Sequence, residues 1–142
     1  MRRMAHDDLG RMLLGAFRAF EVDVIEAFAE RELDDLRPSY ASVYAHVRAE
    51  GSRLSDLARA ASMTKQGMAD IVREMQDAGL VRRAPDPEDG RAVLVVLTAK
   101  GRRRLTQASR AIERVEGRVR RRLGERRYEA LRTALADLSS SA

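Results

Sequence analysis

The sequence contains no cysteine and no tryptophan, and only 4% of its 142 residues are aromatic. Without cysteine, disulfide bonds, thiolate metal sites and thiol-based oxidation switches are excluded. No apolar run approaches the roughly 20 residues that a membrane-spanning helix needs, and no signal-peptide core is visible. We therefore expect a cytoplasmic protein that makes no contact with a membrane.

The residue patterns that enzymes use are also missing. The two histidines, His6 and His46, are far apart and are not spaced like metal ligands. The sequence has no phosphate-binding glycine loop and no serine nucleophile elbow. The adjacent carboxylates Asp34 and Asp35 fall in a polar stretch just before a proline, which is typical of a connecting segment. We expect neither an enzyme nor a bound cofactor or metal.

The chain is rich in charge, and the charge is unevenly distributed. Charged residues make up 35% of the sequence and give a net charge of +5, which favours a polyanionic partner. Residues 1–98 carry a net charge of −3, residues 99–142 carry +8, and residues 53–91 are neutral. Overall basicity therefore says little about the central segment. The arginine clusters at 102–104 and 120–122 either add a favourable field near a duplex or form solvated helix faces.

The segment 53–98 reads as two helices followed by two strands. A first helix is indicated by apolar residues with helical spacing at Leu54, Leu57, Ala58 and Ala61. Ser55 suits the N-cap of this helix, and Thr64 suits the N-cap of the next one. The second helix has an apolar stripe at Met68, Ile71, Val72 and Met75. Gly79 is placed to end it, because glycine adopts the left-handed conformation without a clash.

Two short strands are expected after this helix. Leu80-Val81 begins the first strand, and the run from Val93 to Leu97 forms the second. Between them, residues 85–91 contain two prolines and a glycine, which predict a hairpin tip and not a strand. Two helices, a tight turn and a hairpin in this order predict a winged helix-turn-helix. A small α+β element without a partner is the alternative interpretation.

The hairpin resembles the wing of the MarR family of bacterial transcriptional regulators. The resemblance rests on Asp89, Arg91, Leu97 and Thr98, together with the preceding helix MTKQGMADIVREMQDAGLV, and it covers residues 53–105. Gly90 departs from the pattern, because many members carry an arginine there. The resemblance implies a sequence-specific DNA-binding regulator, and we expect a ligand-responsive repressor. The competing interpretation is a winged helix that binds a protein and does not recognise a DNA sequence.

The candidate DNA-binding residues lie on the second helix and at the wing. The N-terminal turn of a recognition helix is nearest the base edges in the major groove, and here it consists of Thr64, Lys65, Gln66 and Gly67. Gln66 has the amide geometry to pair with adenine, and Lys65 can reach guanine or a phosphate. Asp70 and Arg73 follow on outward-looking positions. Each of these residues is alternatively a solvated surface position.

Arg91 at the wing tip is the strongest single candidate for a DNA contact. A narrow minor groove concentrates negative potential and attracts arginine. Asp89 would be repelled by DNA, and the resemblance implies that it orients Arg91 through a charge-assisted hydrogen bond.

Three amphipathic helices flank the central segment. Their apolar residues have helical spacing, at Leu9, Leu13, Phe17, Phe20, Val24 and Phe28, then at Leu105, Ala108, Ile112, Val115, Val119 and Leu123, and finally at Tyr128, Leu131, Leu135 and Leu138. Gly124 separates the last two helices. This apolar area exceeds what a small winged helix needs, so we expect residues 1–36 and 99–142 to form a homodimer around the DNA-binding region 37–98. A bundle within one chain is the alternative.

The fold class is therefore mainly α, with a small β-hairpin wing and terminal dimerisation helices. Two-fold symmetry predicts a near-palindromic operator with half-sites about 10 bp apart, or a small multiple of that.

The resemblance also implies a small aromatic or phenolic anion as a ligand. Candidate pocket residues are Phe17, Arg18, Tyr40, Tyr44 and His46. Arg18 is able to pair with a carboxylate, and the two tyrosines are four residues apart, which places them on one helix face. Alternatively, the tyrosines are core or interface aromatics and His46 is an ordinary polar side chain.

Overall fold

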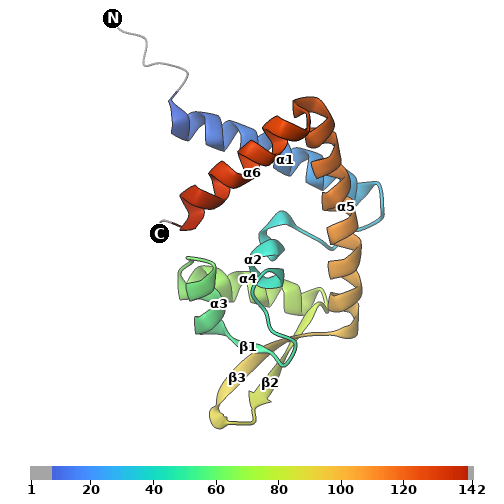
Figure 1. Cartoon of the computed structure of the whole chain (residues 1–142). Helices are drawn as coiled ribbons and strands as arrows, with labels where there is room; N and C mark the ends of the chain where they lie inside the picture. Colours follow the sequence, from blue (N-terminus) through green and yellow to red (C-terminus); the bar gives the residue numbers. More distant parts are fainter. Residues whose placement is uncertain (1–7, 141–142) are drawn as a thin grey trace, which may run out of the picture. The chain divides into compact units, whose positions relative to one another are not determined.

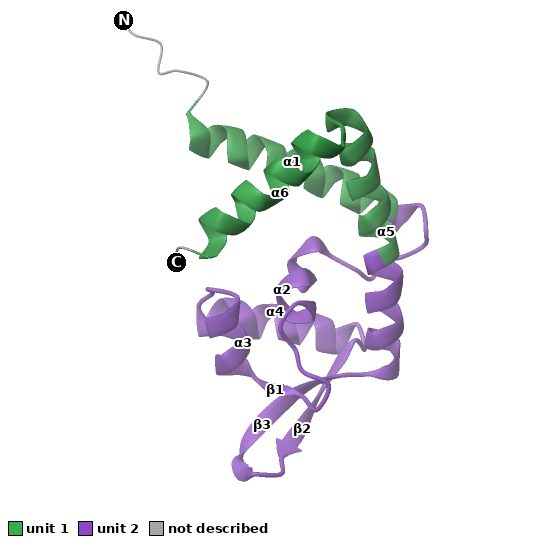
Figure 2. Cartoon of the chain, in the orientation of Figure 1, with its two compact units in different colours: residues 1–27, 110–142 green, residues 28–109 purple. Residues whose placement is uncertain are grey.

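The computed structural model describes residues 8–140, and these form two compact units (Figure 2). The central unit is Phe28–Ser109, and the terminal unit combines Met1–Ala27 with Arg110–Ala142. His6 lies outside the described residues. The predicted DNA-binding range 37–98 falls wholly within the central unit. The division into a dimerisation region, residues 1–36 and 99–142, and a DNA-binding region, residues 37–98, stays a prediction.

The central unit contains a helix-turn-helix and a three-stranded antiparallel sheet (Figure 1). Its elements are η1 (Pro38–Tyr40), α2 (Ala41–Tyr44), β1 (Ser52–Arg53), α3 (Leu54–Ala60), α4 (Lys65–Asp77), β2 (Val81–Asp86) and β3 (Asp89–Leu97). The strand order is β1-β3-β2, and β2 and β3 project as a hairpin. The core consists mainly of Leu33, Val43, Leu57, Met68, Val72, Met75 and Leu80, which are all 1% exposed or less. The mainly α winged fold expected from the sequence is confirmed.

The turn between α3 and α4 depends on one left-handed residue and one cap. Ser62 has φ +54°, which reverses the chain directly after α3. Thr64 then caps α4, because its side-chain oxygen accepts a hydrogen bond from the backbone N–H of Gly67 at 3.0 Å. The predicted cap at Thr64 is thus confirmed, while the one at Ser55 is wrong. Strand β1 runs straight into α3, so Arg53 occupies the N-cap position and Ser55 falls inside the first turn.

The hairpin has longer strands than the sequence indicates. The predicted loop over residues 85–91 is wrong, because β2 continues to Asp86 and β3 starts at Asp89. Proline is tolerated at position 85 because β2 is an edge strand, where a missing N–H costs no hydrogen bond to a further strand. Pro85 pairs with Val93, and an irregularity follows between Pro85 and Asp86. The turn itself is reduced to Pro87 and Glu88.

The terminal unit consists of helical segments whose apolar faces are only partly covered. The helices are α1 (Leu9–Ala29), α5 (Ala99–Leu123) and α6 (Glu125–Ser140), and the first residues of α5 belong to the central unit. Gly124, with φ +82°, separates α5 from α6 as predicted. Val24, Ala111, Val115 and Tyr128 of the terminal unit are buried, as are Phe28 and Ala108, which lie on α1 and α5 but belong to the central unit. The apolar side chains of α1 and α6 that stay exposed include Leu9, Leu13, Phe17, Leu131, Leu135 and Leu138.

Within residues 8–140, no helix combines the length and the apolar character that crossing a membrane requires.

Candidate nucleic-acid interface

The N-terminal turn of α4 presents polar side chains to solvent. Thr64, Lys65 and Gln66 are exposed, and Gly67 is half-buried. A Cβ added at Gly67 would lie 3.0 Å from the Thr64 side-chain oxygen, which is tighter than an ordinary contact. Glycine at this position therefore preserves the cap as well as leaving the backbone accessible. The helix presents its positive dipole end in the same place.

The outward face of α4 continues with Asp70 and Arg73, both exposed. The side-chain amide nitrogen of Gln66 donates to Asp70 Oδ1 at 3.0 Å, and Arg73 donates to the same oxygen at 3.2 Å. Met68 and Val72 on the opposite face are completely buried. Burial on one side and a linked polar stripe on the other fix which face of α4 is available to a partner.

The wing carries Arg91 near the start of β3, with an exposed side chain. Asp89 accepts a hydrogen bond from the backbone N–H of Arg91 at 3.1 Å. The carboxylate of Asp89 also lies 3.7 Å from the guanidinium of Arg53. Among the described residues, the ion-pair partner of Asp89 is thus Arg53. Asp89 contacts Arg91 through the backbone N–H of Arg91. The orienting role of Asp89 stays a prediction, now with a backbone contact as its basis.

Arg53 and Asp86 are residues of the wing that the sequence alone did not identify. Two nitrogens of Arg53 donate to Asp86 Oδ2, at 2.8 and 3.1 Å. The other carboxylate oxygen of Asp86 accepts from the backbone N–H of Glu88 at 2.9 Å. The hydrogen bond from Glu88 and the one from Arg53 both lower the pKa of Asp86. Asp86 therefore stays ionised and joins the hairpin turn to β1.

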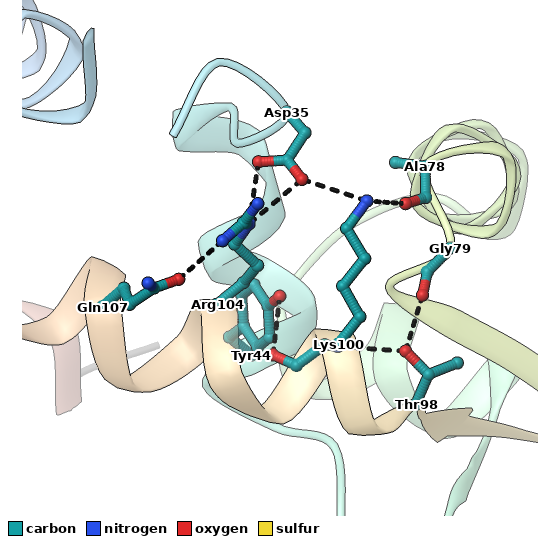
Figure 3. Close-up of polar contacts among 9 residues, drawn as sticks. Asp35, Tyr44, Ala78, Gly79, Thr98, Lys100, Arg104 and Gln107 are labelled. Atoms are coloured by element: carbon teal, nitrogen blue, oxygen red, sulfur yellow. Dashed lines mark hydrogen bonds and ion pairs between the residues drawn. The ribbon is translucent and has the colours of Figure 1, made fainter. Parts of the chain in front are cut away.

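Hydrogen bonds join the C-terminal end of α4 to the start of α5, and Figure 3 shows them among the polar contacts of this region. We call Asp35, Tyr44, Thr98, Lys100 and Arg104 the α5 junction. Thr98 donates from its hydroxyl to the carbonyl of Gly79 at 2.6 Å, and Lys100 donates to the carbonyl of Ala78 at 2.7 Å. These two carbonyls belong to the end of α4, where backbone acceptors have no partner within the helix.

Asp35 connects the chain that precedes η1 to the same turn of α5. Its carboxylate lies 3.0 Å from Arg104 and 3.2 Å from Lys100 (Figure 3). Burial alone would raise the pKa of Asp35, but hydrogen bonds from Arg104 and Lys100 outweigh burial and lower it. The carboxylate is therefore ionised at neutral pH. The sequence predicts only a connecting segment at Asp35, because the residues that pair with it are more than 60 positions away.

The α5 junction also requires a glycine. A Cβ built at Gly101 would overlap the carbonyl oxygen of Leu80. The same carbonyl accepts a hydrogen bond from the backbone N–H of Thr98 at 3.0 Å. The start of α5 and the α4–β2 connection are therefore in direct backbone contact.

The residues predicted to form a ligand pocket lie in different environments. Tyr40 is buried, and Tyr44 is half-buried with its hydroxyl donating to the carbonyl of Gly101 at 3.1 Å. Burial raises the pKa of Tyr44 to about 12. His46 is exposed just after α2, in the same unit. Phe17 and Arg18 belong to the terminal unit and are exposed on α1. Their common role as a pocket stays a prediction.

The sequence of this chain is similar to sequences of known transcriptional regulators. Residues 35–92 match the MarR family. The HTH-type transcriptional repressor Rv2887 of Mycobacterium tuberculosis is 33% identical over 90 residues, which cover 63% of this chain and 65% of that protein. The matched part thus spans less than two thirds of the relative's length.

Solved structures resemble the whole chain. A transcriptional repressor, CouR, bound to a 23-mer DNA duplex has a TM-score of 0.81 and 25% identity, with 98% of this chain and 99% of that chain covered. The Rv2887 protein of M. tuberculosis in complex with salicylic acid has a TM-score of 0.69 and 27% identity, with 93% and 96% covered. The names of these relatives describe regulators and not enzymes.

Proposed function

We propose that the chain is a member of the MarR family and acts as a sequence-specific DNA-binding repressor, as a homodimer in the cytoplasm. The observation that carries the proposal is the outward face of α4. Its capped first turn and polar stripe are exposed, while the opposite stripe is completely buried. A helix with this division is suited to entering a major groove with its N-terminal residues foremost. CouR, which has a similar fold, is bound to a DNA duplex in its structure, and this supports DNA as the partner of the present chain.

In the proposed complex, Lys65 and Gln66 approach base edges and Arg91 enters the minor groove. Thr64 and Gly67 bring the backbone at the start of α4 close to the duplex, and Arg73 lies further along the helix. Residues 53–91 carry as many acidic as basic side chains, so binding depends on individual cations and not on a net positive charge of this segment. Loss of one of them is therefore a sensitive test.

Selection of bound duplexes from a random library, followed by salt titration, tests the proposal. We expect an enriched near-palindromic sequence and an affinity that falls steeply with salt, because bound phosphates release counterions. Arg91→Ala is expected to weaken binding by about 1–3 kcal/mol. Arg59→Ala is the matched control, because Arg59 is an exposed arginine of α3 outside the proposed contact set. A library without any enriched sequence would favour a winged helix that binds a protein.

The proposed homodimer is supported by the exposed apolar side chains of α1 and α6. Phe17 is 58% exposed in the single chain and Leu138 is also 58% exposed. Large exposed apolar patches mark interaction surfaces, and a symmetric partner would cover the same patch on both copies. We expect Leu135→Asp to shift the protein from dimer to monomer in sedimentation velocity, because the dimer would bury an unpaired charge.

We also propose that a small aromatic anion regulates DNA binding. Salicylic acid is the ligand in the Rv2887 complex, which supports this chemical class. The candidate ligand contacts are Tyr40, Tyr44 and His46 in the central unit and Phe17 and Arg18 in the terminal unit, and Arg18 is the proposed partner of the carboxylate. Adding salicylate to the selected duplex complex is expected to release the protein, and Arg18→Ala is expected to abolish that release. Release that is unchanged in the variant would remove Arg18 from the pocket.

A further inference from the structure

The exposed polar face of α4, which is the proposed DNA-binding face, contains acidic side chains. Helix α4 carries two basic and three acidic side chains, so its net charge is −1. Phosphates line both sides of a DNA groove, and a carboxylate that faces them is repelled. Asp70 lies in the middle of the proposed contact face and is exposed. Its presence there needs a physical reason other than attraction to DNA.

Asp70 has two neighbours on the same stripe. Gln66 is one turn before it and Arg73 one turn after it, at the spacings that bring helical side chains into contact. The Gln66 amide nitrogen donates to Asp70 Oδ1 at 3.0 Å, and Arg73 donates to that same oxygen at 3.2 Å. Asp70 therefore neutralises Arg73 and orients Gln66 at the same time.

The orientation of the Gln66 amide follows from chemistry. An ionised carboxylate only accepts hydrogen bonds, so the amide must turn an N–H toward Asp70. One of its two N–H groups is then occupied, which leaves the carbonyl oxygen and the second N–H for another partner.

This orientation distinguishes the two purines. Adenine offers a donor at N6 and an acceptor at N7, whereas guanine offers acceptors at both O6 and N7. With one N–H held by Asp70, Gln66 still satisfies both adenine groups. Guanine would need both N–H groups, so it would receive one hydrogen bond and would place O6 against the Gln66 carbonyl oxygen.

We propose that Asp70 is a positioning residue of the recognition helix, which holds Gln66 so that it reads adenine and discriminates against guanine. The inference rests on the proposed DNA-binding function and names one determinant of its specificity. Asparagine at position 70 either donates or accepts, so it holds the Gln66 amide in either orientation. It also leaves the charge of Arg73 free for a phosphate.

The chain supplies a matched control. Asp77 lies four residues beyond Arg73 on the same stripe and is exposed, and no hydrogen bond or ion pair joins it to Gln66. Asp77→Asn removes the same charge from the same face as Asp70→Asn does. Only Asp70→Asn removes the carboxylate that orients Gln66.

The test begins with a duplex selected by the wild-type protein from a random library. Fluorescence anisotropy with every single-base variant then identifies the position at which Gln66→Ala loses its preference. At that position the wild-type protein is expected to prefer adenine over guanine by about tenfold or more. We expect 7-deazaadenine, which lacks the N7 acceptor, to bind more weakly than adenine.

Asp70→Asn is expected to reduce the preference for adenine to less than about threefold, given tenfold discrimination by a bidentate contact. It is also expected to raise affinity for all duplexes and to steepen the salt slope by about one, because Arg73 gains a phosphate. Asp77→Asn is expected to keep the full preference.

Three results would overturn the inference. The first is an Asp70→Asn protein that keeps the preference for adenine. The second is a loss confined to a cytosine, which would show that Asp70 itself accepts from N4 of that base. The third is a Gln66→Ala protein with unchanged preferences everywhere. If the library yields no enriched sequence, the proposed function fails and this inference fails with it.

Discussion

The central unit buries its own apolar side chains, whereas helices α1 and α6 leave many of theirs exposed. Leu57, Met68, Val72 and Met75 are completely buried within one chain. By contrast, the large apolar residues of α1 and α6 include several between 40% and 62% exposed. The winged helix therefore buries its hydrophobic core within one chain. The exposed apolar side chains of the terminal helices are the observation on which the proposed homodimer rests.

Two leucine-to-alanine substitutions test this comparison most strongly. Leu57→Ala is expected to destabilise the fold by about 2–5 kcal/mol, because it leaves a cavity in a closed core. It should lower the melting temperature at every protein concentration. Leu135→Ala removes the same atoms from a side chain that is 40% exposed, so its effect should appear mainly as a weaker dependence of melting on concentration. Equal effects that do not vary with concentration would contradict the contrast.

Helix α5 allows the same substitution to be made in both units. Gly101→Ala is expected to cost about 3 kcal/mol, because the new Cβ would overlap the Leu80 carbonyl oxygen. Gly117→Ala meets only Arg121 at an ordinary distance of 3.5 Å, so the better helix propensity of alanine should stabilise the protein by about 0.5–1 kcal/mol. Chemical denaturation measures both values. A Gly101→Ala protein as stable as the wild-type protein would show that α5 is not held against Leu80.

The polar groups of the α5 junction extend the comparison to charge. Asp35→Asn is expected to destabilise the protein by about 1–2 kcal/mol near neutral pH, since two charge-assisted contacts are lost. The pKa of Asp35 is lowered in the folded protein. Its contribution is therefore present above the unfolded pKa of 3.8 and is lost as pH falls through the lower folded pKa.

Denaturation at several acidic pH values should show a shallower loss of stability for Asp35→Asn than for the wild-type protein. Asp34→Asn supplies the control, because it removes an exposed carboxylate next to Asp35. An identical profile for all three proteins would mean that the carboxylate of Asp35 contributes nothing.

The smallest expected effect concerns Tyr44. Removing its hydroxyl in Tyr44→Phe is expected to cost about 1 kcal/mol for the hydrogen bond to Gly101. Because burial raises the pKa of Tyr44 from 10 to about 12, its neutral form is favoured in the folded protein. The corresponding stability is present below pH 10 and is lost as pH rises to about 12. Alkaline denaturation should be less steep in the variant, and an unchanged slope would place the Tyr44 hydroxyl in water.

The sequence predicts the parts of the fold that are local. The cap at Thr64, the apolar stripe of α4 and the helix break at Gly124 all depend on residues within a few positions of one another. The exposure of the candidate DNA-binding residues follows from the same periodicity. The order of the elements in residues 53–98 followed from these local patterns too, and the resemblance to MarR regulators added the expected function.

Contacts between distant segments escaped prediction. The two residues of β1 form a strand only because β3 pairs with them, and that pairing moves the start of α3 away from Ser55. The ion pairs of Asp35 with Arg104 and of Arg53 with Asp86 join residues far apart in the chain. The sequence predicts a loop at Pro85. Its position on an edge strand depends on the strand order of the whole sheet, which local patterns do not give.

Sedimentation of the protein with its selected duplex tests the central claim most directly. We predict two subunits on each duplex, bound to inverted half-sites about 10 bp apart or a small multiple of that. The exposed apolar residues of α1 and α6 would then be covered by the second copy. A single subunit on each duplex, with full affinity for one half-site, would contradict the account.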